Sequence, residues 1–114
     1  MVFYRASIGG GGGGGGSTVK TGSIVGSRQN VVIDVGFQPK KLYIYDFSKA
    51  YPHSCIYDED VSTTQFLRNV YSGSGSTVAW TNIGATGGIS IRSISNTGFT
   101  FRGNGYATNY VAIG

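Results

Sequence analysis

Short segments rich in Val, Ile, Tyr, Phe and Thr recur from residue 18 to the end of the chain, and glycine separates most of them. Roughly eight such segments follow one another at spacings of about 8 to 12 residues, which is the pattern of an all-β sandwich or barrel. A chain of 114 residues has room for one such domain with a single modest core. We therefore predict an all-β fold over residues 18–114, an antiparallel β-sandwich of jelly-roll-like type.

The alternation of apolar and polar residues indicates which side chains the sandwich buries. Residues 29–37 read as a buried strand. In the next strand Leu42 and Ile44 share one face, and near the C-terminus Phe99 and Phe101 do the same. We expect these four side chains to point into the core.

The stretch 58–71 fits two structures. Ser62 followed by Gln65 matches a helix capping box, and the apolar residues after it have helical spacing. Phe66 and Val70 fit the alternation of a strand equally well, and the threonines before them favour a strand. A strand is the prediction.

Residues 1–17 differ in composition from the rest of the chain. Eight consecutive glycines follow an eight-residue peptide that is too short to bury its own apolar side chains. Such a peptide needs a partner surface, so we predict a docking arm over residues 1–17 ahead of the sandwich domain at 18–114. Its predicted contact residues are Val2, Phe3, Tyr4, Ile8, Gly9, Gly10, Gly11, Gly12, Gly13, Gly14, Gly15 and Gly16.

The glycine run itself allows two interpretations. As a flexible tether it would span roughly 15 Å, whereas as an extended three-fold helix it would reach about 25 Å. A mere spacer would tolerate serine, but a run made only of glycine indicates backbones that approach too closely for any Cβ. We therefore favour an ordered, packed glycine segment over a disordered tether.

Charge excludes one class of partner. Charged residues make up 12% of the chain, about half the usual share, and the net charge of +4 is scattered. Nucleic-acid binding needs clustered basic residues, so it is not expected. A surface of Ser, Thr, Asn, Gly and Tyr is typical of contacts with sugars or with sibling subunits.

The sequence predicts neither a disulfide nor a membrane segment. Cys55 is the only cysteine, and charge or glycine interrupts every apolar stretch within a few residues. No secretory leader is recognisable either, so synthesis in a cytoplasm is expected.

No set of residues completes a catalytic, metal or cofactor site. His53 and Cys55 would share a strand face, but a structural metal site needs four ligands. We interpret them as a loop-edge histidine and a small buried cysteine. The acidic run 58–60 lacks the alternation of a calcium loop and reads as a solvated turn. Lys20 lacks the preceding glycine of a phosphate-binding loop. The protein is not expected to be an enzyme.

Tyrosines supply the candidate contacts of the sandwich. If Leu42, Ile44, Val111 and Ile113 point inward, the tyrosines between and beside them point outward, where tyrosine favours protein interfaces and stacking on sugars. Simple strand propensity explains the tyrosines equally well. The candidate interface or glycan contacts are Tyr43, Tyr45, Tyr51, Trp80, Tyr106 and Tyr110.

Two stretches carry a resemblance to a known group of proteins. The stretch "VVIDVGFQPKKLYIYD" and the C-terminal "ISNTGFTFRGNGYATNYVAIG" resemble a recurring module of tailed-bacteriophage virion proteins. Its marks are a Gly-Phe-x-Pro-Lys turn between apolar strands, a Gly-Phe-Thr hairpin and a terminal strand. They correspond here to Gly36, Phe37, Pro39 and Lys40, to Gly98, Phe99 and Thr100, and to Tyr110, Ala112, Ile113 and Gly114.

The resemblance implies a non-enzymatic virion subunit. The expected role is capsid decoration or a head fibre, with attachment through the arm, assembly as a symmetric homo-oligomer, a trimer first of all, and contacts to other virion proteins. The alternative is a tail-tip receptor-binding module that recognises a host surface glycan. A sugar-binding domain unrelated to phages is a further alternative.

Overall fold

The computed structural model describes residues 18–24, 26–46, 53–72, 75–86, 88–103 and 105–114. The arm at 1–17, with all its predicted contact residues, and Tyr51 lie outside the described residues.

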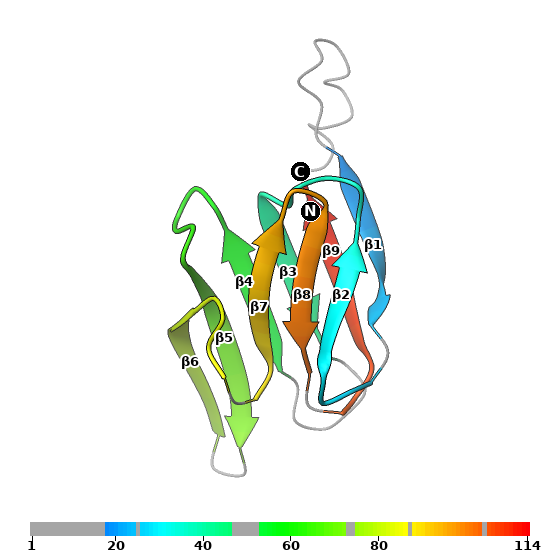
Figure 1. The fold of residues 1–114 in the computed structure, drawn as a ribbon. Helices are drawn as coiled ribbons and strands as arrows, with labels where there is room; N and C mark the ends of the chain where they lie inside the picture. Colours follow the sequence, from blue (N-terminus) through cyan, green and yellow to red (C-terminus); the bar gives the residue numbers. More distant parts are fainter. Residues whose placement is uncertain (1–17, 25, 47–52, 73–74, 87, 104) are drawn as a thin grey trace.

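Nine strands in two antiparallel sheets make up the described part of the chain (Figure 1). The larger sheet has six strands in the order β1-β9-β3-β4-β5-β6, and the smaller sheet has three in the order β2-β8-β7. The strands are β1 (Val19–Ile24), β2 (Asn30–Asp34), β3 (Lys41–Tyr45), β4 (Ser54–Asp58), β5 (Gln65–Ser72), β6 (Gly75–Asn82), β7 (Ser90–Ser95), β8 (Gly98–Arg102) and β9 (Thr108–Ile113).

The predicted all-β sandwich is confirmed. The two sheets pack face to face, and the described residues contain no helix (Figure 1). A jelly roll distributes eight strands over two sheets, whereas here the sheets hold six and three strands. The smaller sheet therefore covers only part of the larger one.

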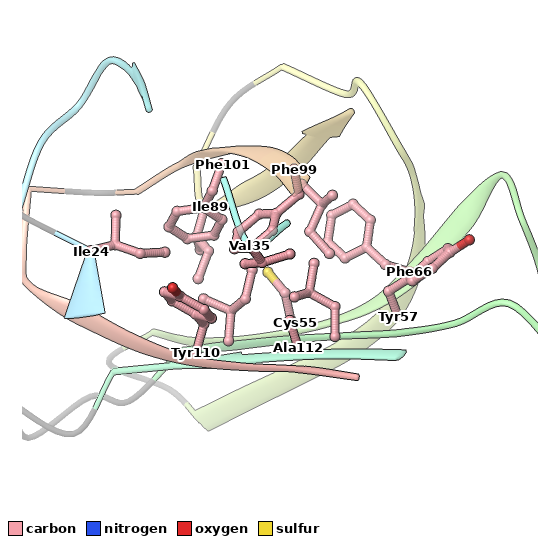
Figure 2. Packing of buried hydrophobic residues seen from close by; sticks show 13 residues of the cluster. Ile24, Val35, Cys55, Tyr57, Phe66, Ile89, Phe99, Phe101, Tyr110 and Ala112 are labelled. Carbon is pink, nitrogen blue, oxygen red and sulfur yellow. The ribbon is translucent and has the colours of Figure 1, made fainter. Parts of the chain in front are cut away.

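The core lies between the sheets, where inward-facing residues of every described strand except β6 meet (Figure 2). Leu42 and Ile44 of β3 are buried, as are Phe99 and Phe101 of β8, so the predicted alternation is confirmed at these positions. Burying each large apolar side chain stabilises the fold by about 1.5–3 kcal/mol. The core cluster consists of Ile24, Val35, Leu42, Ile44, Cys55, Tyr57, Phe66, Ile89, Ile91, Phe99, Phe101, Tyr110 and Ala112.

Strand β2 is less buried than its sequence predicts. Val32 is 77% exposed, whereas Val31 and Ile33 pack against the core from one face. The prediction of a buried strand at 29–37 is wrong because β2 is an edge strand of the smaller sheet, whose second face no described strand covers. Its apolar run therefore reflects strand propensity as much as burial.

Residues 65–71 of the ambiguous stretch belong to strand β5, as predicted, whereas residues 59–64 connect β4 to it. Phe66 is fully buried, and β5 pairs with β4 and with β6. Ser62 Oγ accepts hydrogen bonds from the backbone N–H groups of Thr64 at 3.2 Å and Gln65 at 3.1 Å. The capping-box residues thus stabilise a turn that leads into a strand instead of a helix.

The start of the described chain is held beside its end. Thr18 N donates to Gly114 O at 3.2 Å, and Gly114 N donates to Thr18 O at 2.9 Å. These bonds extend the β1–β9 pairing beyond Val19 and Ile113. The described chain therefore begins at the β1 edge of the larger sheet, the edge opposite β6.

Candidate functional site

The six-stranded sheet has an inner face on the core and an outer face that no described strand covers (Figure 1). Because successive side chains of a strand point to opposite faces, the residues between the buried ones belong to the outer face. In β3, for example, Leu42 and Ile44 are buried and Tyr43 between them points outward. We call this surface the outer face.

A row of large side chains crosses five neighbouring strands on the outer face. Tyr43 of β3 lies opposite Val111 of β9 and, on its other side, opposite Ile56 of β4. Ile56 lies opposite Leu67 of β5, and Leu67 lies opposite Trp80 of β6. Directly opposite residues share a face, so these five side chains form one continuous line. We call it the apolar row.

The apolar row is accessible. Trp80 is 51% exposed and Ile56 is 38% exposed, and the other three members are half-buried. Contiguous exposed apolar side chains of this kind mark interaction sites more often than single ones do.

Charge on the outer face is confined to one corner. Among its described residues Lys41 and Asp58 alone are charged, and they lie opposite each other in β3 and β4. Lys41 Nζ is 3.3 Å from Asp58 Oδ1 and 3.3 Å from Asp60 Oδ2. Hydrogen bonds to both carboxylates raise the pKa of Lys41. The rest of the outer face suits a partner surface of low charge.

The acidic run forms the turn after β4. Asp58 Oδ1 accepts the backbone N–H of Asp60 at 3.0 Å, and Asp60 is exposed. Asp58 and Asp60 both pair with Lys41, so these carboxylates already have a cationic partner. The interpretation as a turn is confirmed.

Most of the described tyrosine and tryptophan candidates lie on the surface. Tyr43 and Tyr45 belong to the outer face and are half-buried, as predicted from the burial of Leu42 and Ile44. Trp80 belongs to the same face. Tyr106 is 46% exposed but precedes β9 and is not part of it.

Tyr110 is the exception, because it is only 6% exposed. The prediction that it points outward is wrong: β9 buries Tyr110 and Ala112, and Val111 takes the outer face. Tyr110 lies opposite Ile44 of β3 and Gly22 of β1, and a Cβ at Gly22 would come within 2.7 Å of the Tyr110 hydroxyl oxygen. The missing side chain at Gly22 makes room for the buried ring.

The neighbouring pair His53 and Cys55 is inaccessible. Cys55 is fully buried, and burial raises the pKa of its thiol well above the ordinary value, so the thiol stays protonated. A protonated buried thiol is a poor nucleophile and a poor metal ligand. His53 is 8% exposed, and its carbonyl oxygen accepts the Asp46 N–H at 3.1 Å. The described residues contain no group of three or more His, Cys, Asp or Glu arranged to hold a metal ion.

Sequence reasoning missed three members of the apolar row, Ile56, Leu67 and Val111. A signal was present, because Cys55, Ile56 and Tyr57 form an unbroken apolar run in which both faces of one strand are apolar. Such a run indicates either burial on both faces or an apolar surface on one of them.

A second feature lies at the end of the sandwich where β8 stops. A hollow of about 250 Å³ is lined by Arg28, Gly88, Arg102 and Gly103. Guanidinium groups beside an open hollow favour an anionic ligand group.

Comparison of the chain with protein-family models, with curated proteins and with solved structures found no match. Within the described residues no helix is long and apolar enough to span a bilayer.

Proposed function

We propose that the chain is a non-enzymatic structural subunit of a tailed-bacteriophage virion, a capsid-decoration or head-fibre protein attached through its N-terminal arm. The observation that carries the proposal is the apolar row on an outer face whose only described charges are one ion pair. A broad, low-charge surface suits permanent contact between subunits better than capture of a small substrate. The resemblance of residues 31–46 and 94–114 to a virion module supplies the biological setting.

The non-enzymatic part of the proposal rests on the nucleophile and acid candidates. The Cys55 thiol is buried and protonated, and Asp58 and Asp60 pair with Lys41. General acid–base chemistry needs groups that reach a bound substrate, and these do not offer such an arrangement.

The proposed partners are copies of the same chain and other virion proteins, and the proposed location is the virion. Exposed aromatic side chains such as Trp80 favour a symmetric homo-oligomer. The number of three copies, which the resemblance implies, stays a prediction.

Tailed-phage particles purified from cells that carry the gene test the proposal. Mass spectrometry of the particles and immunogold electron microscopy with an antibody against the purified chain should find the protein on the head. Wild-type particles that lack the chain would contradict the virion role, and gold confined to the tail tip would favour the alternative.

That alternative is a tail-tip module that binds a host surface glycan. Exposed Trp80 offers a stacking surface, and the hollow beside Arg28 and Arg102 would suit an acidic sugar. The isolated protein should then bind host envelope polysaccharide, and Trp80→Ala or Arg102→Ala should weaken that binding. A capsid-decoration protein should instead bind preformed capsids and show no affinity for the polysaccharide.

A further inference from the structure

Strand β6 is an edge strand of the six-stranded sheet, and it differs from the other described edge strands in its lack of features that hinder pairing with another chain. It pairs with β5 at every position from Gly75 to Asn82 without a register shift, and no described strand pairs with its other side. Its sequence contains neither a charged residue nor a proline. Natural edge strands usually carry such residues, or a bulge, to prevent pairing with another chain.

The other three edge strands do carry a charge. Lys20 lies in β1, Asp34 in β2 and Arg92 in β7. The pairing of β7 with β8 also shifts register between Ile91 and Ser93. Among the described edges, β6 alone lacks these protective devices.

Two large side chains of β6 are exposed beside this open edge. Val78 is 58% exposed and Trp80 is 51% exposed. They are two residues apart, so both belong to the outer face, and Trp80 is the last member of the apolar row. The edge therefore offers main-chain pairing and apolar side-chain contact together.

The geometry restricts how β6 can pair with itself. A two-fold axis perpendicular to the sheet makes the strands antiparallel and keeps both outer faces on one side, so each residue must meet a residue of its own face. Gly75 is the first residue of β6, and its φ of +129° lies outside the extended range, so the regular part of the strand is Ser76–Asn82. The centre of that stretch is Ala79.

Centring the axis on Ala79 gives a favourable set of side-chain pairs. Val78 then lies opposite the partner's Trp80, and Trp80 lies opposite the partner's Val78. A β-branched residue opposite an aromatic one is among the favoured cross-strand pairs. Because β6 is uncharged, two copies approach without like-charge repulsion along the paired edge.

We propose that β6 pairs antiparallel with β6 of a second copy of this chain, about a two-fold axis at Ala79, and joins the two six-stranded sheets. This contact is the surface through which the proposed virion subunit would associate with its own copies, so the inference rests on that proposal. Its two-fold symmetry gives a dimer, in contrast to the trimer expected from the resemblance.

Charge placed on the axis tests the contact in the full-length chain. Ala79 is exposed and would face its own copy, so Ala79→Glu and Ala79→Lys each set like charges directly opposite one another. Each variant alone should raise the dimer dissociation constant by at least about tenfold. An equimolar mixture of the two should restore association. Thr21→Glu and Thr21→Lys, on exposed positions of the β1 edge, are the matched controls and should not change it.

Sedimentation equilibrium at micromolar concentration is the measurement. The wild-type chain of 12.0 kDa should sediment at twice its mass, with circular dichroism confirming that every variant is folded. A wild-type monomer, a trimer, or a dimer that both Ala79 variants retain would overturn the β6 contact. A trimer would leave the proposed virion role intact, and that role fails separately if purified particles lack the chain.

Discussion

The rings of Phe99 and Tyr110 meet edge to face between the two sheets, with centroids 5.4 Å apart and planes inclined at 76°. Phe99 belongs to β8 of the smaller sheet and Tyr110 to β9 of the larger one. This contact joins the two sheets. It is made by Tyr110, which the sequence analysis placed on the surface. Edge-to-face packing also adds about 0.5–1.5 kcal/mol to the stabilisation from burial.

Removing the Tyr110 ring should therefore destabilise the sandwich strongly. We expect Tyr110→Ala to lower the free energy of unfolding by about 3–5 kcal/mol, because it leaves a cavity beside Phe99. Tyr110→Phe retains the ring and should cost less than about 1 kcal/mol. Urea unfolding of both variants measures the difference. Equal losses would mean that the hydroxyl, and not the ring, stabilises this site.

Gly98 should resist substitution for a reason that the sequence does not reveal. A Cβ at this position would overlap the carbonyl oxygen of Ile33, which belongs to the backbone of the paired strand β2. Backbone cannot move aside as a flexible side chain can, so Gly98→Ala should cost about 3 kcal/mol.

Gly36 provides the matched control for Gly98. Its φ is +87°, but a Cβ there meets no atom within 4 Å. Gly36→Ala should therefore cost only the backbone strain of about 1 kcal/mol. Denaturant midpoints that fall equally for both variants would refute crowding as the role of Gly98.

The difference between β3 and β9 shows how far the sequence predicts the fold. In β3 only Leu42 and Ile44 form a fully apolar set, so the buried face follows from alternation. In β9 apolar residues occupy both faces, and no local pattern distinguishes Tyr110 from Val111. The choice depends on Gly22, which leaves space for a ring on the neighbouring strand.

The apolar row, like the burial of Tyr110, depends on contacts between residues far apart in the sequence. Its five members come from five strands, and they line up only because the registers of four strand pairs agree. Composition indicates a low-charge surface. Strands β3 to β6 are neighbours in chain order, but the sequence reveals neither their registers nor the placement of β9 beside β3. Trp80 and Tyr43 were predictable as aromatics of the sandwich surface, whereas their alignment through Ile56 and Leu67 was not.

Stability should fall as the pH rises above about 9. Burial raises the pKa of Cys55 above its ordinary 9.0 and that of Tyr57 above its ordinary 10.0. In the unfolded chain these groups lose their protons first, so above pH 9 the folded state binds more protons and the free energy of unfolding decreases. Below pH 9 their contribution is complete.

Chemical denaturation between pH 7 and pH 11 checks this dependence. Cys55→Ala lowers stability at every pH because it removes a buried side chain, but its curve should be flatter from pH 9 to pH 10. Tyr57 and Lys41, whose pKa values are also raised, still titrate in that variant and should produce the remaining decline. Curves that run parallel for both proteins would show that the thiol does not contribute.

Asp58 should stabilise the turn after β4 through two separable contacts. It accepts the Asp60 N–H and pairs with Lys41. Asp58→Ala removes both and should cost about 1 kcal/mol, mainly through the lost turn hydrogen bond. Asp58→Asn keeps an acceptor oxygen and should cost only about 0.5 kcal/mol. In about 1 M salt the gap between wild type and Asp58→Asn should close, since screening weakens an accessible ion pair.

The N-terminal arm should be dispensable for folding and for self-association, and required for attachment to the particle. In the part of the chain that the structure describes, both sheets consist of residues from Val19 onward, and Thr18 is held by its two hydrogen bonds to Gly114. Removing residues 1–16 leaves these bonds intact, so the thermal midpoint should not change. The arm joins the sheet at β1, whereas the proposed contact between copies uses β6 at the opposite edge, so the sedimentation mass per assembly should still correspond to two chains. The truncated chain should nevertheless be missing from particles purified from cells that carry the shortened gene.

Serine at positions 11–14 keeps the length of the arm but adds side chains, and it should lower the number of copies per particle if the glycine backbones pack closely. Normal incorporation of the serine variant would show that the glycines act only as a tether. Normal incorporation of the truncated chain would show that attachment does not depend on the arm.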